Sequence, residues 1–449
     1  MAKTKPVGYE FWRSVLREAK YVMAPMVDQS ELAWRLLGRR YGIDLCYTPM
    51  LHAGVFSRDV NYRRESLVTC PEDRPLIVQF CGNDPDVVLA AARLAEPHCD
   101  AIDLNLGCPQ SVAKRGRYGA FLQDDWDLVY RIVSTLHTNL SIPVTCKVRI
   151  FPEIEKSVRY AQMLERAGCQ LLTVHGRTRE QRGVDTGLAN WEHVREMKSN
   201  VSIPVFSNGN VQYLHDVTKC LEETKVDGIM SAEGVLYNPA LFTGTFPTSW
   251  QITDEYLALV KEHPCPISFV RGHLFKVWHH VLDRYPNMRP VLAKAHNLEE
   301  IAAVCQSLKE RALPDYSEGL VEDFGYDSIP YYRCQPYFRP ETVRLLTGKQ
   351  LIKRPLDSVE DDSRLEKKIR IRKERKLAKK ESFEEKKSRG RWTACAECGK
   401  NPKGKRCEHG MCRVCCKVHC AVKVLDCVGH RLVFKTRLEG EKVLEGKAT

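Results

Sequence analysis

The first group of residues in this sequence that could do chemistry is built around one thiol. Cys108 lies in the segment Ala101-Ile-Asp-Leu-Asn-Leu-Gly-Cys-Pro109. Residues 101–104 are apolar apart from one acid, which predicts a buried parallel strand. Gly107 and Pro109 predict a tight loop just past that strand, where an α/β barrel places its chemistry. The alternative is a buried structural thiol, because free cysteine is a common core residue.

The second group is a run of cysteine and histidine residues between positions 395 and 430. It contains two Cys-x2-Cys pairs, which have the spacing that grips a tetrahedral zinc ion. The predicted zinc ligands are Cys395, Cys398, Cys407, Cys412, Cys415, Cys416, His419 and Cys420, with Cys427 and His430 as further donors. Such a short segment is not expected to fold without metal. The alternative is a chance cluster, and the spacing does not tell which donor belongs to which ion.

Charge is distributed unevenly along the 449 residues, whose net charge is +12. Residues 364–391 hold 14 lysine and arginine residues against 5 acidic ones, and residues 392–449 hold 12 against 6. The first 363 residues are therefore slightly acidic. A basic tail on a near-neutral body predicts contact with a polyanion such as RNA. The alternatives are a solvated helix or linker, or a nuclear-import signal.

The body of the chain alternates short apolar runs with amphipathic stretches, which predicts eight strand–helix units. The predicted strands are 21–25, 45–48, 76–80, 101–104, 144–148, 171–174, 205–207 and 228–231. Amphipathic stretches such as 85–95, 126–136, 154–166 and 211–221 lie between them, and residues 51–71 are less clear. We therefore predict an α/β fold, a (β/α)8 TIM barrel. A doubly wound sheet is the competitor, but no Gly-x-Gly-x-x-Gly opens the first unit.

Composition predicts five regions. These are an N-terminal segment (1–20), a barrel (21–262), a small helical domain (263–350), a basic linker or helix (351–391) and a Cys/His-rich zinc module (392–449). Within the helical domain we expect helices at 269–282, 291–297 and 298–311. Its aromatic residues Tyr331, Tyr332, Tyr337 and Phe338 predict core packing, with base stacking as the alternative.

If these runs are barrel strands, polar or small residues follow one strand after another at the same end. They are Pro25 and Met26, Gln79, Asn105 and Cys108, Lys147 and Arg149, His175, Arg177 and Arg179, Asn208, Gly209 and Asn210, and Ala232 and Glu233. Together they predict a polar ring of the kind that forms a barrel active site. Small and Gly-containing turns after the last two strands expose N–H groups to a phosphate. Lys147 and His175 suit an electron-rich ring, so a flavin mononucleotide fits better than a sugar.

Six motifs in this order resemble those of the tRNA-dihydrouridine synthases. They are Met23-Ala-Pro-Met26, Asp103-Leu-Asn-Leu-Gly-Cys-Pro109, Cys146-Lys-Val-Arg149, Val174-His-Gly-Arg-Thr178, Asn208-Gly-Asn210 and Met230-Ser-Ala-Glu-Gly234. The ending Ser231-Ala-Glu-Gly…Tyr237-Asn-Pro-Ala-Leu241 is similar to the eukaryotic branch that acts on uridines 16 and 17 of the tRNA D-loop. The resemblance implies an FMN enzyme that takes hydride from NADPH or NADH and reduces uridine to dihydrouridine.

The resemblance also implies roles for the residues of the ring. Cys108 would be the general acid that protonates C5 after hydride reaches C6, since an ordinary thiol with a pKa near 8–9 carries its proton at neutral pH. The implied flavin contacts are Pro25, Met26, Gln79, Lys147, His175, Asn208, Gly209, Asn210, Ala232 and Glu233. The implied tRNA contacts are Asn105, Arg177 and Arg179, and the flavin phosphate is the alternative partner of the two arginines. The basic tail and the zinc module would be further contacts for tRNA.

Two other functions compete with this one. A small-molecule pyrimidine oxidoreductase, of the dihydroorotate or dihydropyrimidine type, would share the barrel, the FMN and a cysteine, but would not need the basic tail. An RNA-binding scaffold would have lost catalysis. Scattered cysteines, an N-terminus without an apolar signal and no apolar run of about 18 residues predict a soluble protein of the cytoplasm, the nucleus or both. We expect a monomer with no obligate protein partner and no membrane contact.

Overall fold

The computed structural model describes residues 5–318, 325–326, 328–338, 393–399, 403–404, 406–430 and 432–433. The chain divides into two compact units, residues 1–342 and 343–449. The predicted basic segment 351–391 lies outside the described residues. No helix in the described ranges has both the length and the apolar composition needed to cross a bilayer. The finer divisions expected at residues 20, 262, 350 and 391 stay predictions.

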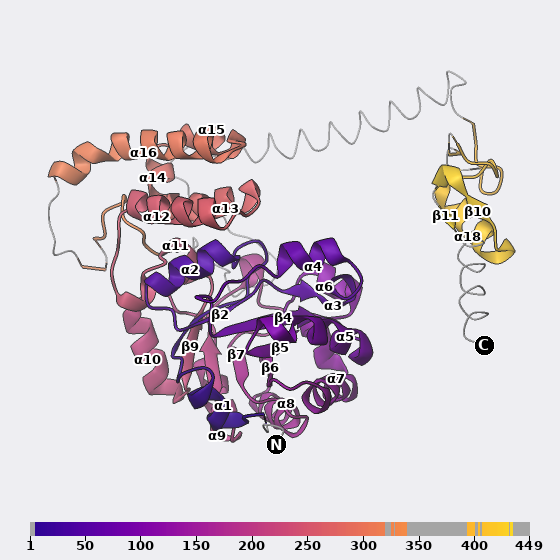
Figure 1. Cartoon of the computed structure of the whole chain (residues 1–449), viewed down its shortest axis with the longest axis horizontal. Coiled ribbons are helices and arrows are strands. Elements are labelled where there is room, and N and C mark those ends of the chain that lie inside the picture. Colours follow the sequence, from indigo (N-terminus) through magenta and orange to yellow (C-terminus); the bar gives the residue numbers. More distant parts are fainter. Residues whose placement is uncertain are drawn as a thin grey trace, which may run out of the picture. The chain divides into compact units, whose positions relative to one another are not determined.

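The centre of the first unit is a closed barrel of parallel strands (Figure 1). Its strands are β1 (Tyr21–Met23), β2 (Leu45–Tyr47), β4 (Leu76–Cys81), β5 (Ala101–Leu106), β6 (Val144–Arg149), β7 (Leu172–His175), β8 (Val205–Asn208) and β9 (Gly228–Ser231). Each pairs in parallel with its neighbours, and the β1–β9 and β2–β4 pairings close the ring. The predicted (β/α)8 barrel is confirmed, and an open sheet is excluded.

Two apolar cores hold the barrel together, one inside the ring and one outside it. The inner core contains Val22, Ile77 and Phe206, all fully buried. Its amino-terminal end is closed by Phe11 of α1 (Gly8–Ser14), which belongs to the same cluster. The outer core joins the strands to the surrounding helices. Strands that are buried on both faces explain why their sequences are nearly continuous apolar runs.

Six of the helices around the barrel follow its strands, and three of them begin at a side-chain cap. The six are α2 (Leu32–Arg40), α5 (Pro85–Ala95), α7 (Trp126–Asn139), α8 (Ile154–Arg166), α9 (Trp191–Ser199) and α10 (Leu214–Thr224). Asp84, Asp125 and Asn190 cap α5, α7 and α9 by accepting bonds from backbone N–H groups of the first turn. The predicted ranges 85–95 and 154–166 agree with α5 and α8.

Short elements fill the region after the second strand that the sequence left unclear. They are β3 (Leu51–His52), α3 (Ala53–Phe56) and α4 (Val60–Ser66). β3 pairs with the end of β4 and adds nothing to the closure of the barrel. Two further short helices, α6 (Ser111–Gly116) and α11 (Glu233–Tyr237), follow β5 and β9.

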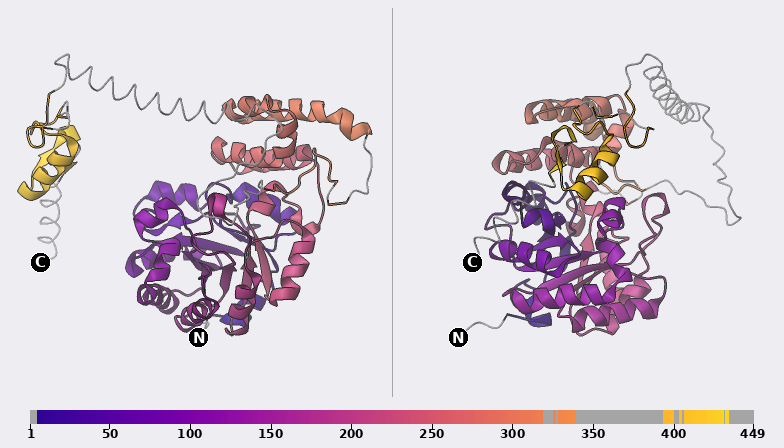
Figure 2. Two further views of the ribbon diagram at one scale, coloured as in Figure 1. Left: turned by 180° about the vertical axis from the view of Figure 1, so that it is seen from behind. Right: turned by 90° about the vertical axis from the view of Figure 1, so that its right-hand side faces the viewer.

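A layer of helices lies beside the barrel and shares its outer core (Figures 1 and 2). It contains α12 (Ser249–Glu262), α13 (Ile267–Val277), α14 (His279–Arg284), α15 (Met288–Lys294) and α16 (Leu298–Glu318). Glu31, in the loop after β1, accepts bonds from Tyr256 (2.7 Å) and His273 (2.9 Å) of this layer. The helical layer is therefore fixed to a loop at the carboxyl end of the barrel.

The aromatic residues that end the helical region mostly pack inward. Tyr332 is buried, Tyr331 donates a hydrogen bond to Asp315 (2.6 Å), and Tyr337 stacks on Tyr237. Only the ring of Phe338, among these four, is exposed. This arrangement favours the core-packing interpretation for three of them.

The described part of the second unit is small, and most of its buried core residues are cysteines. It contains α18 (Arg413–Lys423), β10 (Asp426–Cys427) and β11 (Leu432–Val433), and the two strands pair antiparallel. Five of the six buried side chains in its core are cysteines, and the sixth is Met411.

Candidate active site

Several residues predicted for the site, together with Asp103, occupy paired positions on neighbouring strands at the carboxyl end of the barrel. From β4 to β8 the paired positions are Gln79–Asp103, Asn105–Lys147, Arg149–His175 and His175–Asn208. Paired residues of adjacent strands face the same side of a sheet, so these positions form one polar arc. The register of the barrel thus brings together side chains that lie far apart in the sequence.

Cys108 stands on the loop that follows β5, and the loop is held from three sides. The Asn105 side-chain oxygen accepts bonds from the N–H groups of Gly107 (3.2 Å) and Cys108 (2.9 Å). The carbonyl of Cys108 accepts a bond from the N–H of Ala120 (3.1 Å), and Arg149 donates to the carbonyl of Gly107 (2.8 Å). The thiol is half-buried beside Cys81 and Tyr118. Its position is thus set by the backbone around it.

A glycine behind the cysteine leaves room for this loop. Gly119 has a φ of +64°, and a Cβ atom there would lie 2.7 Å from the carbonyl oxygen of Cys108. Any larger residue would have to push the Cys108 segment outward or distort its own backbone.

A chain of buried amides connects the cysteine loop to an acid inside the barrel. Asn105 donates from Nδ2 to Oε1 of Gln79 (2.8 Å), and Gln79 donates from Nε2 to Asp103 (2.7 Å). Thr145 donates to the other oxygen of Asp103 (2.7 Å). The carboxylate can only accept, so it fixes which way the Gln79 amide faces, and Gln79 in turn orients Asn105.

Four cationic or basic side chains gather on β6, on β7 and in the loop after β7, next to the thiol. Lys147 donates to the side-chain oxygen of Asn208 (2.9 Å). Arg149 donates to the carbonyls of Gly107, Thr178 and Gln181, and Arg177 donates to Nε2 of His175 (3.1 Å). The side-chain hydrogen bonds of Lys147 and Arg149 go to an amide and to backbone carbonyls. Their positive charge is thus available to an anionic ligand.

Burial shifts the protonation of these groups in consistent directions. It lowers the pKa of Lys147 to about 8, with Arg149 adding to the effect, and it lowers the pKa of Arg149 to about 10. Burial, followed by the nearby cations, holds the pKa of His175 well below its usual range, so the imidazole is neutral at pH 7. Burial also raises the pKa of Asp103 to about 6.

The loops after β8 and β9 carry the residues expected to meet a phosphate. Gly209 and Asn210 both have positive φ, and a Cβ atom at Gly209 would lie 2.8 Å from Cβ of Ala189. Asn210 accepts bonds from Arg177 (3.1 Å) and from the N–H of Ala189 (2.8 Å). These bonds tie the Asn210 turn to the Arg177 loop. Ala232 is half-buried at the start of α11, and Glu233 is exposed.

The remaining predicted residues lie at the margin of the arc. Pro25 and Met26 are half-buried after β1, and the N–H of Met26 donates to Ser30 (3.1 Å). Arg179 is paired with Asp124 (2.7 Å) and Glu180 (3.2 Å), and its guanidinium lies 5.4 Å from the centre of the Phe121 ring. Arg179 is therefore held by acids of the protein, unlike Lys147 and Arg149.

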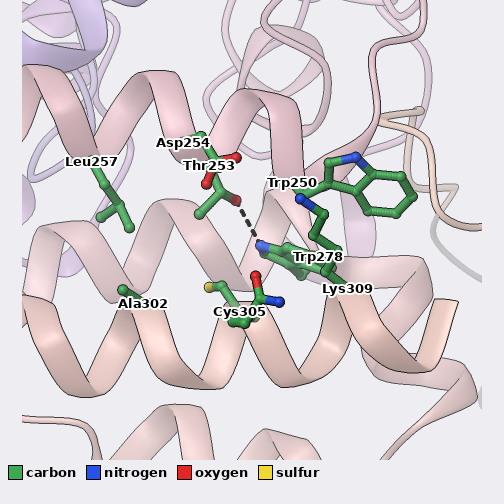
Figure 3. Close-up of a pocket in the computed structure, with 9 residues that line it drawn as sticks. Trp250, Thr253, Asp254, Leu257, Trp278, Ala302, Cys305 and Lys309 are labelled. Carbon is green, nitrogen blue, oxygen red and sulfur yellow. Dashed lines mark hydrogen bonds between the residues drawn. The ribbon is translucent and has the colours of Figure 1, made fainter. Parts of the chain in front are cut away.

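A small cavity elsewhere in the first unit does not compete with this site. It lies between α12 and α16, beside Trp278, which follows α13 and donates a hydrogen bond to Thr253 (Figure 3). Its volume of about 40 Å³ holds a few water molecules at most, whereas ligand pockets hold roughly 300–1,000 Å³. We assign no ligand to it.

The second unit gathers donor atoms that could hold metal. Two groups of four, in which all donor atoms lie within 4.8 Å of one another, are Cys395, Cys398, Cys412 and Cys415, and Cys407, Cys416, Cys427 and His430. A third group has three members, His409, Cys416 and Cys420. His419, which the sequence suggested as a ligand, belongs to none of these groups of described residues.

Comparison with known proteins gives a consistent result. The dihydrouridine synthase (Dus) family model matches residues 22–314, which is more than half of the chain. The chain belongs to the dihydrouridine synthase family. Relatives named as dihydrouridine synthases carry NAD(P)(+) in their names.

Relatives resemble nearly the whole chain. A Mus musculus protein named tRNA-dihydrouridine(16/17) synthase-like is 53% identical over 446 residues, covering 98% of this chain and 93% of the mouse protein. A Schizosaccharomyces pombe tRNA-dihydrouridine(16/17) synthase is 42% identical over 399 residues, covering 82% and 99%. A Homo sapiens tRNA-dihydrouridine(20a/20b) synthase-like protein is 36% identical over 266 residues, covering 59% and 83%.

The site of this dihydrouridine synthase family member fits a flavin phosphate. Lys147, Arg149 and Arg177 provide buried or half-buried positive charge beside the Asn210 turn. Gly209 leaves room there that a side chain would fill. Gln79 is fully buried, with both ends of its amide bonded to Asp103 and Asn105. Its contact with a flavin stays a prediction.

Two features of the site were not predicted from the sequence. Asp103 and Thr145 orient Gln79, and the single acid in the apolar run 101–104 was the signal for them. Gly119 supports the Cys108 loop, and no motif marks it. Outside this site, Cys427 and His430, which the sequence offered as further donors, join a four-donor group, whereas the predicted ligands His419 and Cys420 do not belong to it.

Proposed function

We propose that this protein is a tRNA-dihydrouridine synthase that reduces uridines 16 and 17 of the tRNA D-loop to dihydrouridine. The observation that carries the proposal is Cys108, presented on a braced loop beside Lys147 and Arg149. Near end-to-end similarity to relatives named for positions 16 and 17 supports the choice of substrate.

The flavin is FMN in this proposal, and the reductant is NADPH or NADH. Bound FMN supplies the hydride that adds to C6 of the uracil ring. Lys147 and neutral His175 hold the ring system, and Met26 with Pro25 packs against it. The turns at Asn208–Asn210 and Ala232–Glu233, with Arg177, receive the phosphate. Positive charge from Lys147 and Arg149 favours the anionic parts of the cofactor.

The thiol of Cys108 supplies the proton. Addition of hydride at C6 leaves C5 basic, and an acid has to be positioned at C5 to complete the saturated bond. Asn105 and Gly119 fix the backbone of Cys108, so they decide where the thiol points. Asn105 and Arg179 border the thiol loop and are the proposed contacts for the nucleotide.

The target uridine leaves its stack to reach this site, because C5 and C6 are inaccessible in folded RNA. Binding of the tRNA draws on the helical layer and on the basic residues after position 363. We propose a monomer that acts in the cytoplasm, the nucleus or both.

The test is position-resolved mapping of dihydrouridine in an unmodified tRNA transcript treated with the purified protein and NADPH. Product at positions 16 and 17 supports the proposal. Product at other positions would keep the chemistry and reject the assigned positions. Reduction of free pyrimidines with no product on tRNA would point to a small-molecule oxidoreductase. Absence of bound flavin and of any product would point to an RNA-binding scaffold.

A further inference from the structure

We propose that the second unit binds two zinc ions through interleaved ligand sets. The first ion is bound by Cys395, Cys398, Cys412 and Cys415, and the second by Cys407, Cys416, Cys427 and His430. This inference concerns the second unit alone and does not depend on the proposed enzymatic activity.

The spacing of the donor atoms is that of tetrahedral zinc. A Zn–S bond of about 2.3 Å implies about 3.8 Å between two sulfurs of a tetrahedron. The Sγ atoms of Cys398 and Cys412 lie 4.0 Å apart in the first set. In the second set, Sγ of Cys407 lies 3.6 Å from Cys416 and 4.0 Å from Cys427. Sγ of Cys427 lies 3.7 Å from Nδ1 of His430.

The backbone presents the donors on two matching turns. Gly399 donates its N–H to the carbonyl of Cys395 (2.9 Å), and Gly410 donates to the carbonyl of Cys407 (3.2 Å). Both glycines have positive φ, which lets the chain turn back after Cys398 and after Cys407. The N–H of Ala396 donates to the carbonyl of Gly410 (3.1 Å), so the two turns are joined.

The second set is completed by a close approach of two segments. A Cβ atom at Gly404 would lie 2.3 Å from Nε2 of His430, and one at Gly429 would lie 1.8 Å from the carbonyl oxygen of Arg406. Only glycine at both positions allows His430 to reach the Cys407 turn. This packing places a histidine donor that has no Cys-x2-Cys spacing to mark it.

The two sets alternate along the chain. Cys412 and Cys415 of the first set are followed by Cys416 of the second set, all at the start of α18. One helix therefore contributes to both ions, and each ion bridges segments that the other does not.

The described residues of the second unit bury little else that could stabilise it. Its core consists of cysteines and Met411, while Val414, Val418, Val422 and Val428 are between 61% and 81% exposed. Because so little apolar surface is buried, metal binding would supply the folding free energy. Thiolate-rich tetrahedral sets favour zinc among the available divalent ions.

Cys420 and His409 are the competing donors. Sγ of Cys420 lies 3.7 Å from Sγ of Cys416. However, their group offers three donors instead of four. A structural zinc site is four-coordinate, so the set with Cys427 and His430 is preferred.

The test measures metal in the full-length protein by elemental analysis, with amino-acid analysis for the chain concentration. The wild type is expected to hold two zinc ions per chain. Cys412→Ser and Cys427→Ser are each expected to lose at least one ion. The matched controls, Cys420→Ser and His419→Ala, are expected to keep two.

A second measurement covers variants that fail to fold. Wild-type protein is freed of metal and titrated with Co²⁺, whose thiolate charge-transfer absorption scales with the number of Co–S bonds. Saturation at two equivalents, with absorption for seven Co–S bonds, supports the assignment. One ion or none in the wild type would overturn the proposal, and loss of an ion in Cys420→Ser would overturn the second ligand set. The flavin content of each variant shows separately whether the barrel is folded.

Discussion

Asp103 orients the buried amides that support the Cys108 loop, and its raised pKa makes this role testable. It lies fully buried in the barrel and accepts hydrogen bonds from Gln79 and Thr145. Its neighbours only partly offset the cost of burying a charge, so its pKa rises to about 6 from an ordinary value of 3.8. The protein thus keeps an unfavourable carboxylate in order to fix the orientation of the amides that support the Cys108 loop.

This raised pKa predicts how stability depends on pH. A group whose pKa is higher in the folded state stabilises the fold below its ordinary pKa, and that stability is lost as the pH rises through the folded pKa. From pH 4 to pH 6, the wild type should therefore lose about 2 kcal/mol of unfolding free energy relative to Asp103→Asn. Urea denaturation of both proteins across this range measures the difference. Parallel pH profiles would contradict the assignment.

Lys147 predicts a pH dependence of cofactor affinity. Because burial lowers its pKa to about 8, the apoprotein loses this positive charge above pH 8, and its affinity for FMN should fall there. Lys147→Gln should weaken FMN binding about 10- to 100-fold at pH 7, as expected for one charged hydrogen bond, and should flatten the profile. Fluorescence titration of the apoprotein measures both effects. Lys156→Gln, on α8, is the control and should bind FMN like the wild type.

At the scale of elements, the loop after β5 depends on one glycine. Gly119→Ala should lower kcat/KM for tRNA at least about 10-fold while flavin content is kept, because the new methyl group would displace Cys108.

Gly183 is the matched control for Gly119. Its φ is +60°, close to the +64° of Gly119, but a Cβ atom there would have no neighbour within 4 Å. Both alanine variants therefore carry similar backbone strain, and only one crowds the thiol. Equal losses of activity in the two variants would show that strain, and not the position of Cys108, is responsible.

The elements of the barrel were predictable because each strand is buried on both faces and is therefore apolar throughout. The predicted strand ends then placed Cys108, Lys147 and His175 at the carboxyl end of the barrel. The short elements β3, α3 and α4 were not predicted, since runs of two to seven residues show no clear periodicity. The hydrogen bonds of Gln79 could not be predicted from the sequence either, because they depend on the register in which Gln79 pairs with Asp103.

At the scale of the whole molecule, the proposed zinc sites lower the net positive charge of residues 392–449. Seven thiolates and two divalent cations would remove three positive charges from the 392–449 region, which has 12 basic and 6 acidic residues. Residues 364–391, with 14 basic and 5 acidic residues, contain no such offset. The stronger electrostatic attraction for tRNA should therefore come from residues 364–391.

Neutralising this segment should weaken tRNA binding and flatten its dependence on salt. The variant replaces six cations with glutamine: Arg372, Lys373, Arg375, Lys376, Lys379 and Lys380. Each lost phosphate contact should reduce the slope of log affinity against log salt by roughly 0.7–0.9. The control neutralises six exposed cations of the barrel: Arg131, Arg159, Arg166, Arg195, Lys219 and Lys225. An unchanged slope in the tail variant would show that these six cations do not contact tRNA phosphates.

The central claim is that Cys108 gives the proton to C5, and a single-turnover experiment tests it most directly. Cys108→Ala is compared with wild type and with Cys70→Ser, a half-buried thiol in the segment between α4 and β4. Flavin content and the rate of reduction by NADPH should be equal in all three proteins. Dihydrouridine formation should fall about 10²- to 10⁴-fold in Cys108→Ala alone. Formation at the wild-type rate in that variant would show that another group supplies the proton.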